Sequence, residues 1–359
     1  MRQKKFLRYM KLWFNKNLKS PIYLTFFITT RCNARCKYCF FWKELNSKKK
    51  ELTLKEIEKI SKSMDNLLFL LLSGGEPFLR KDIDELVKIF YRNNHPPFIV
   101  IPTNGILTEI ILEKIRSICD KCPKSDILIS VSLDGPEEIT DKTRNVKGSF
   151  KKTVQTIIKL KELKKPNLSV GVSLTFNAIN QNQILDFYEY LKKEIKPDLI
   201  SPLLIRGKPR EDFTKKVNLK IYKELQDRIE KDYLKKTKRG NLGFSKIVVA
   251  NRIIRAERIY KTALKNRFLS PCYAGIINAI IYPDGKITPC EILDEEFGNI
   301  KDYDYDFKKL WQSSRVKKFR EKIRKEKCFC THECNWTTNI LFNPAYLPRL
   351  LWTASRELL

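Results

Sequence analysis

Three cysteines near the start of the chain are the residues best suited to chemistry. Cys32, Cys36 and Cys39 stand at C-x3-C-x2-C spacing, directly after an apolar run, 22–29, with the composition of a β-strand. Thiolates are the ligands that iron–sulfur clusters need, and three of them on one loop can hold three irons of a [4Fe–4S] cluster. The fourth iron then has no protein ligand, which leaves a position for a substrate or cofactor. Three structural thiols, or part of a zinc site, are the alternatives.

A second group of cysteines lies near the end of the chain. The first two members flank the turn sequence Pro-Asp-Gly at 283–285, which predicts a β-hairpin, and three more follow between 328 and 334. Five thiols are enough for a second metal site, and zinc, which needs four, is the simplest occupant. His332 lies among them, and we interpret it as structural. The group consists of Cys272, Cys290, Cys328, Cys330 and Cys334.

Apolar runs alternate with amphipathic segments over the first two thirds of the chain. Such alternation predicts parallel strands joined by right-handed helical crossovers. The predicted strands are 22–29, 67–73, 97–103, 126–133, 168–176 and 198–205. The predicted helices are 53–65, 81–93, 108–118, 148–164 and 180–194. Six units fit either an open (β/α)6 partial barrel or a doubly wound sheet. In both, the chemistry lies at the carboxyl ends of the strands.

Short motifs occupy those strand ends. The second strand ends in Gly-Gly-Glu-Pro at 74–77, where two glycines let the backbone approach a ligand closely. The fourth strand contains Ser132 just before Asp134-Gly135, and Arg144 follows ten residues after the aspartate. An arginine can bind a carboxylate bidentately. Taken alone, the two glycines are also compatible with a plain turn, and Arg144 is also compatible with a solvated charge on the protein surface.

Together these residues resemble the radical S-adenosylmethionine (radical SAM) enzymes. The resemblance implies the partial barrel, and a [4Fe–4S] cluster whose open iron is chelated by SAM. It places Tyr38 by the adenine, the 74–77 motif at the methionine amino group, Ser132 on the ribose side and Arg144 at the carboxylate. The segment 205–207 is expected to close the barrel end near the adenine. The SAM-binding residues that the resemblance implies are Tyr38, Gly74, Gly75, Glu76, Pro77, Ser132 and Arg144.

The C-terminal cysteines resemble the opening of SPASM and Twitch domains, which bind auxiliary [4Fe–4S] clusters. A full SPASM domain has more cysteines and two clusters. We therefore expect one auxiliary cluster, with one thiol left over, for which Cys328 and Cys330 compete. Cys119 and Cys122 form a lone C-x2-C pair with nothing nearby to complete a site, and we interpret them as structural.

Composition narrows the setting and the partners. The chain has 71 Lys+Arg against 41 Asp+Glu, a net charge of +30, which is compatible with nucleic acid, an anionic membrane or an acidic substrate, or with lysines spread over solvated helices. No signal peptide or membrane span is visible, which favours a cytoplasmic location with reduced cysteines. The basic amphipathic segment 4–18 is expected to pack on its own protein, with peripheral contact to an anionic membrane as the alternative.

We therefore expect four parts: a basic segment, 1–19; a radical SAM core, 20–207; a helical linker, 208–268; and an iron–sulfur domain with a C-terminal helix, 269–359. The resemblance implies reductive cleavage of SAM to a 5′-deoxyadenosyl radical that abstracts hydrogen from a peptide or protein. It also implies a ferredoxin or flavodoxin as electron donor. A radical SAM dehydrogenase of a sugar or other small molecule, and a non-catalytic iron–sulfur carrier or scaffold, are the alternatives. An RNA-modifying role requires strongly salt-dependent RNA binding.

Overall fold

The computed structural model describes residues 10–13, 16–238 and 243–356. Within them, one sheet has the strand order β6-β5-β4-β3-β2-β1-β7-β8-β9. Strands β1 to β6 pair in parallel in chain order, as right-handed β–α–β crossovers require. These strands are β1 (Tyr23–Phe27), β2 (Phe69–Ser73), β3 (Phe98–Thr103), β4 (Asp126–Ser132), β5 (Leu168–Phe176) and β6 (Leu199–Leu204). Because β6 and β9 are its unpaired edges, the sheet is an open, partial barrel.

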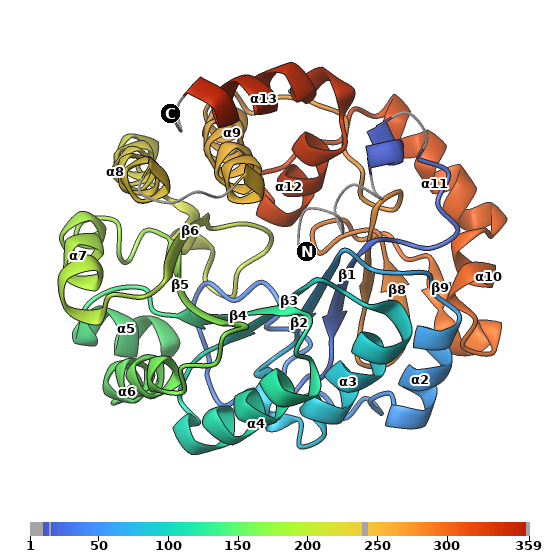
Figure 1. The fold of residues 1–359 in the computed structure, drawn as a ribbon, viewed down its shortest axis with the longest axis horizontal. Helices are drawn as coiled ribbons and strands as arrows, with labels where there is room; N and C mark the ends of the chain where they lie inside the picture. Colours follow the sequence, from blue (N-terminus) through green and yellow to red (C-terminus); the bar gives the residue numbers. More distant parts are fainter. Residues whose placement is uncertain (1–9, 14–15, 239–242, 357–359) are drawn as a thin grey trace.

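Helices cover the outer, convex face of this arc, and the inner, concave face forms the lumen side of the barrel (Figure 1). In β4 the apolar side chains at 127, 129 and 131 are buried, and the intervening residues, which include Ser130 and Ser132, are partly exposed. This period of two places the isoleucines and valine against the helices and the serines in the lumen. The outer helices are α2 (Leu54–Lys62), α3 (Ile83–Asn94), α4 (Thr108–Lys121), α5 (Glu137–Arg144), α6 (Ser149–Glu162) and α7 (Ile184–Tyr190).

The C-terminal hairpin extends the barrel sheet. Its first strand, β7 (Asn278–Ile281), pairs in parallel with β1, with Tyr23 opposite Asn278. The antiparallel strands β8 (Lys286–Thr288) and β9 (Gly298–Asn299) continue the sheet beyond it. The predicted hairpin is confirmed. Its union with the barrel was not predicted, because no local pattern tells a hairpin which distant strand it will join.

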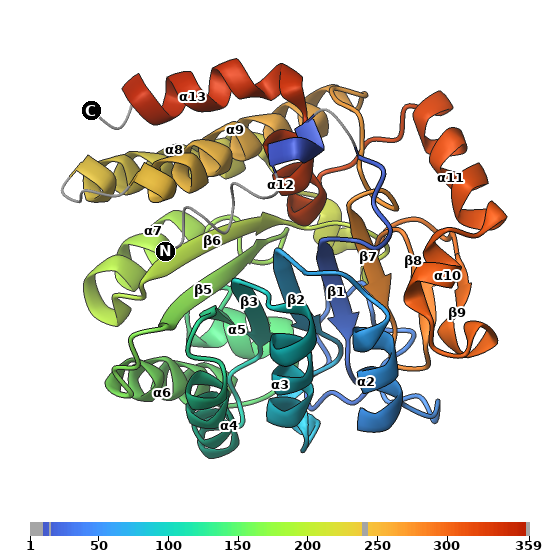
Figure 2. The same ribbon diagram turned by 45° about the vertical axis from the view of Figure 1, so that its right-hand side comes forward.

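Four helices lie across the side of the barrel that the sheet leaves open (Figures 1 and 2). Helix α9 is central to them and packs against the other three. They are α8 (Leu219–Lys238), α9 (Gly243–Lys265), α12 (Glu333–Leu341) and α13 (Leu347–Arg356). Two more helices, α10 (Phe307–Trp311) and α11 (Ser314–Lys325), lie beside β8 and β9. No helix of the described ranges is long and apolar enough to cross a bilayer.

The predicted strands agree with the structure, and one helix of the barrel, α5, was missed, as were α10 to α12 of the C-terminal part. Helix α5, sequence EEITDKTR, has charged residues at most positions and too few apolar ones for a helical pattern. The predicted helix 180–194 is divided between α7 and a π-helical turn, Leu191–Ile195. Most of segment 4–18 lies outside the described residues. Of its described part, Leu12 is buried against the protein, and the Trp13 indole donates a hydrogen bond to the Leu341 carbonyl (2.7 Å).

Candidate active site

One cavity, of about 180 Å³, collects the predicted cluster and SAM residues at the carboxyl ends of the strands. Cys32, Cys36 and Cys39, on the loop after β1, form one side of it. The other predicted residues that line it are Tyr38, Gly74, Gly75, Glu76, Ser132 and Arg144. Pro77 is buried in the short turn Pro77–Leu79 and is not part of the lining. A parallel sheet assembles these residues because all its strands end at the same edge.

The donor set in this cavity fits an iron–sulfur cluster. All three thiols are free and partly exposed. Burial raises the pKa of Cys32 to about 11 and that of Cys39 to about 12, so the thiols of the protein alone hold their protons at neutral pH. A bound metal removes the proton from a coordinating thiol. Three soft donors on one loop, with open space beside them, are what a cluster with one free iron needs.

The glycines at 74 and 75 bring the loop after β2 against the cysteine loop. A Cβ atom on Gly75 would lie 2.1 Å from the Arg31 carbonyl oxygen, and one on Gly74 would lie 2.5 Å from that of Thr29. Because the glycines have no side chain, the two backbones come close enough for hydrogen bonds from Gly75 N to Thr29 O (2.9 Å) and from Glu76 N to Arg31 O (2.8 Å). The glycines are therefore needed for contact between two loops, in addition to any contact with a ligand.

The Glu76 carboxylate connects the loops that follow β2 and β3. It accepts hydrogen bonds from the Thr103 hydroxyl (2.8 Å), from the backbone N–H of Asn104 (2.7 Å) and from that of Phe78 (3.2 Å). Burial raises the pKa of Glu76 to about 7, although these hydrogen bonds oppose the shift. Asn104 in turn donates to the side-chain oxygen of Asn33 in the cysteine loop (2.7 Å). The three loops around the cavity are thus held to one another.

Arg144 reaches the cavity from the end of α5 and is paired with Asp134. Its guanidinium donates to the Asp134 carboxylate (2.7 Å), which also accepts from the Tyr38 hydroxyl (2.7 Å) and from the backbone N–H of Thr175 (2.9 Å). The buried Nε–H of Arg144 has no hydrogen-bond partner. An unpaired donor of a buried cation, on the wall of a cavity, suits a ligand that carries a carboxylate.

The C-terminal cysteines form a second group beside β7. Burial raises the pKa of Cys272 well above its usual value, and three neighbouring thiols, those of Cys290, Cys328 and Cys330, raise it further. Burial raises the pKa of Cys334 to about 11; the charge of Glu291 adds to this shift, and the charge of Arg206 and a hydrogen bond from the Tyr23 hydroxyl oppose it. In the described part of the chain, no three His, Cys, Asp or Glu side chains are grouped to hold one metal ion. A four-iron cluster is larger, so its ligands stand further apart.

A buried ionic network connects this group to the end of β6. Arg206 donates to Glu333 (3.0 Å) and to Glu291 (3.2 Å). His332 caps α12 by accepting from Asn335 N, and its other ring nitrogen lies 2.8 Å from Glu291. His332 is structural, as predicted. The sequence offered no sign that Arg206, expected only to close the barrel end, would bind two carboxylates from the distant module.

Two further sets of residues can be compared with what the sequence indicated about them. Cys119 and Cys122 are packed in the hydrophobic core, which agrees with the structural role predicted for them. In the sequence Asp134 is simply part of an Asp-Gly motif, and Asn104 part of a Thr-Asn-Gly turn at 103–105, yet both connect elements around the cavity. Their neighbours in the chain gave no signal, because their partners come from other strands.

Comparisons with known proteins agree with this geometry. The family model described as "Radical SAM superfamily" matches residues 26–191, and SPASM, described as "Iron-sulfur cluster-binding domain", matches 272–335. The chain therefore contains a radical SAM domain followed by a SPASM domain. It is an enzyme of the radical SAM class, whose core implies a [4Fe–4S] cluster with SAM and whose SPASM domain implies auxiliary clusters.

Relatives of this radical SAM enzyme include maturases. It is 27% identical over 335 residues to the cysteine-type anaerobic sulfatase-maturating enzyme of Clostridium novyi (86% of this chain, 83% of that protein). It is 25% identical over 324 residues to the antilisterial bacteriocin subtilosin biosynthesis protein AlbA of Bacillus subtilis (86% and 65%). It is also 29% identical over 194 residues to the Fe-coproporphyrin III synthase of Methanosarcina barkeri (52% and 44%), of which it spans less than half.

Solved structures share the fold. The native anSMEcpe structure with bound AdoMet and Kp18Cys peptide matches with a TM-score of 0.60 and 18% identity, over 92% of this chain and 98% of that one. Streptococcus suis SuiB bound to its precursor peptide SuiA matches with a TM-score of 0.56 and 18% identity, over 88% and 69%. Both confirm the expected partial barrel.

Proposed function

We propose that this radical SAM enzyme abstracts a hydrogen atom from a peptide or protein substrate, and that an auxiliary [4Fe–4S] cluster accepts an electron from that substrate or binds it. The observation that carries the proposal is the single cavity shared by the three cysteines of the β1 loop and the predicted SAM residues. When bound, the cluster and SAM supply the radical chemistry; the protein supplies binding, orientation and exclusion of water.

The chain's own residues would divide this work. Cys32, Cys36 and Cys39 would hold the cluster at the mouth of the barrel. Arg144 would bind the SAM carboxylate through the part of its guanidinium that lines the cavity, while Asp134 holds the guanidinium in place. Tyr38 and Ser132 would line the nucleoside side, and the 74–77 loop the methionine side, as the resemblance implies. A pure electron carrier needs no such cavity, so the geometry favours an enzyme over the carrier alternative.

We propose Cys272, Cys290, Cys328 and Cys330 as the ligands of the auxiliary cluster. Their thiols are close enough to influence one another's pKa. Cys334 would then be the fifth, non-ligating thiol, in place of Cys328 or Cys330, between which the sequence left the choice open. Four thiolates saturate a cluster, which suits electron transfer; direct substrate binding would need one of them to leave.

The support for a peptide substrate comes from similarity. One relative is named as a sulfatase-maturating enzyme and another as a bacteriocin biosynthesis protein, which suggests protein and peptide substrates. Structures that share the fold also contain bound peptides. The net charge of +30 would favour acidic partners, which include a ferredoxin or flavodoxin as electron donor. A cytoplasmic location, where thiols stay reduced, remains part of the proposal, as does the four-part division of the chain with boundaries at 19, 207 and 268.

The test is production of 5′-deoxyadenosine by anaerobically reconstituted protein given SAM and a strong reductant. We expect turnover in the wild type and none in the Cys32/Cys36/Cys39→Ala variant. The matched control is Cys119/Cys122→Ala, which removes two thiols outside the cavity and should retain activity. Absence of turnover in wild-type protein that carries its clusters would favour the carrier alternative. Mass spectrometry of candidate acidic peptides after turnover then tests the substrate class.

A further inference from the structure

Two arginines of α9 point toward the barrel and contact only uncharged partners. Arg252 donates a hydrogen bond to the Ser201 hydroxyl (3.3 Å) and lies over the Tyr233 ring (5.0 Å). Arg255 donates to the Thr337 hydroxyl (2.9 Å). They are three residues apart, so they share one face of the helix. Throughout the described residues, neither guanidinium has a carboxylate within 4.0 Å, the limit for an ion pair.

Both arginines line a cavity of about 260 Å³ inside the barrel. Helices α9 and α12 form one wall of it, and the amino-terminal halves of β1 to β5 form the other. The strand side is largely apolar, with rings from Tyr23, Phe69 and Phe98, and Asp126 is the acidic side chain of the lining. Such a space, apolar with a few converging polar groups, is typical of a small-molecule or side-chain pocket.

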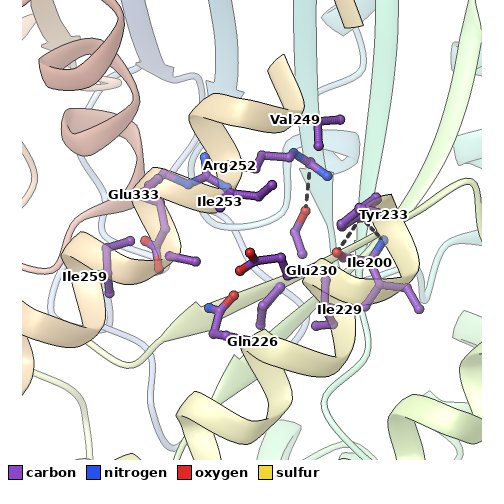
Figure 3. A pocket seen from close by; sticks show the side chains of 14 residues that line it. Ile200, Gln226, Ile229, Glu230, Tyr233, Val249, Arg252, Ile253, Ile259 and Glu333 are labelled. Carbon is purple, nitrogen blue, oxygen red and sulfur yellow. Dashed lines mark hydrogen bonds between the residues drawn. The ribbon is translucent and has the colours of Figure 1, made fainter. Parts of the chain in front are cut away.

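A second, narrower pocket lies on the other side of the same arginines, between α8, α9 and β6. Figure 3 shows Arg252 facing Glu230 and Gln226 of α8 across it. The Glu333 carboxylate also lines this pocket, but it accepts hydrogen bonds from Arg206 and from the backbone of Leu204. The acidic groups near the arginines are therefore either engaged elsewhere or beyond ion-pair distance.

The surroundings make these two cations costly. Burial lowers the pKa of Arg255 and the charge of Arg252 lowers it further, while the charge of Glu333, which is beyond ion-pair distance, partly opposes the shift. Both side chains are only partly exposed. A charge that has lost much of its water is normally paired, because losing water without gaining a counter-charge is unfavourable. Arg206, in the same region, shows the usual solution with two carboxylates. Within the described residues, Arg252 and Arg255 have no such carboxylate partner, and a bound anion would provide the missing counter-charge.

The position of Arg252 relates this pocket to the SAM cavity. Ser132 of β4 pairs with Ser173 of β5, and Ser173 pairs with Ser201 of β6, so all three face the lumen in one row. Ser132 lines the SAM cavity and Ser201 accepts from Arg252. Neighbouring strands are about 4.8 Å apart, which places the two ends of the row roughly 10 Å from each other. Arg252 therefore approaches the SAM cavity along this row, although the strand residues that line its own pocket lie toward the amino ends of the strands.

We propose that Arg252 and Arg255 form an anion site that anchors a carboxylate of the substrate inside the barrel. The inference that the anion belongs to the substrate rests on the proposed function. The carboxylate would come from an acidic side chain or from a peptide C-terminus, and bidentate guanidinium contacts would orient it.

The test uses cluster-loaded protein with SAM at fixed ionic strength and small carboxylate probes. N-acetyl-aspartate α-methylamide imitates an acidic side chain, N-acetylglycine imitates a C-terminus, and N-acetyl-asparagine methylamide is the neutral control. We expect a saturable rise in the thermal midpoint with at least one carboxylate probe and none with the asparagine compound. Arg252→Gln and Arg255→Gln should weaken the apparent affinity at least tenfold, Arg255→Lys less so, and Arg315→Gln on the exposed face of α11 not at all.

Each outcome bears on the proposal. Equal effects of the carboxylates and the asparagine control in the wild type would overturn it, whatever the variants do. Undiminished binding in Arg255→Gln would also overturn it. Production of 5′-deoxyadenosine without substrate separates the two proposals: turnover without carboxylate binding refutes the anion site alone, and carboxylate binding without turnover refutes the proposed function alone.

Discussion

Asp134→Asn is expected to leave a buried guanidinium without its counter-charge. The side chains of Asp134 and Arg144 are 0% and 2% exposed and lie 2.7 Å apart. Asparagine keeps an oxygen that can accept from the backbone of Thr175, but it presents an N–H₂ group or a neutral oxygen to Arg144. The Tyr38 hydroxyl loses a charged acceptor at the same time.

The expected loss is about 3–5 kcal/mol in the free energy of unfolding, the range for removing one partner of a buried ion pair. Midway, about 4 kcal/mol is roughly a thousandfold change in the folding equilibrium. The reason is that Arg144 cannot lose its proton and cannot reach water. For a chain of this size such a loss should lower the urea midpoint by about 1 M or more.

The measurement is anaerobic urea unfolding of reconstituted protein at pH 7, with and without SAM. Asp294→Asn is the matched control, because its pair with Lys208 is 85% and 76% exposed and should contribute no more than about 0.5 kcal/mol. The double variant Asp134→Asn/Arg144→Gln should lose less than the sum of the single losses, since it removes the uncompensated charge.

A loss no greater than that of Asp294→Asn would refute the reasoning, as would strict additivity in the double variant. SAM adds a further criterion. If its carboxylate binds Arg144, saturating SAM should stabilise Asp134→Asn more than the wild type. Equal stabilisation of the two proteins by SAM would show that Arg144 does not bind the SAM carboxylate, while its pairing with Asp134 would still be supported.

Three further outcomes are expected. Cys330→Ala should lower the iron content by about four atoms per chain, because it removes a proposed auxiliary ligand, whereas Cys334→Ala should retain all the iron; equal losses would contradict the assignment. Gly75→Ala should destabilise the protein by roughly 1–3 kcal/mol or more in urea unfolding, because its Cβ would meet the Arg31 carbonyl at 2.1 Å. Burial raises the pKa of Asp84, but hydrogen bonds from three side chains of α4 hold it below its usual value. The stabilising effect of Asp84 should therefore be present above about pH 4 and be lost as the pH falls further. The unfolding free energy of Asp84→Asn should approach that of the wild type at acidic pH, and a difference that stays constant with pH would contradict this.

The sequence by itself determined the strands, the order of the β–α units and the cluster loop. Each of these depends on local information: an apolar run of strand length, a capping box at Thr53 and Glu56 that is present in the structure, or thiols at C-x3-C-x2-C spacing. Local patterns persist in the fold because hydrogen bonding and burial along one element act over a few residues. The family resemblance then chose the open barrel, which periodicity alone could not do.

Only the tertiary structure decided which distant groups meet. It joined β7 to β1, brought Arg206, just after β6, to Glu291 and Glu333, and placed Arg252 and Arg255 on the wall of an inner cavity. In the sequence these arginines are ordinary members of a strongly basic chain. What distinguishes them is partial burial and the absence or presence of a counter-charge. Both depend on elements far away in the chain, so no local pattern could predict them.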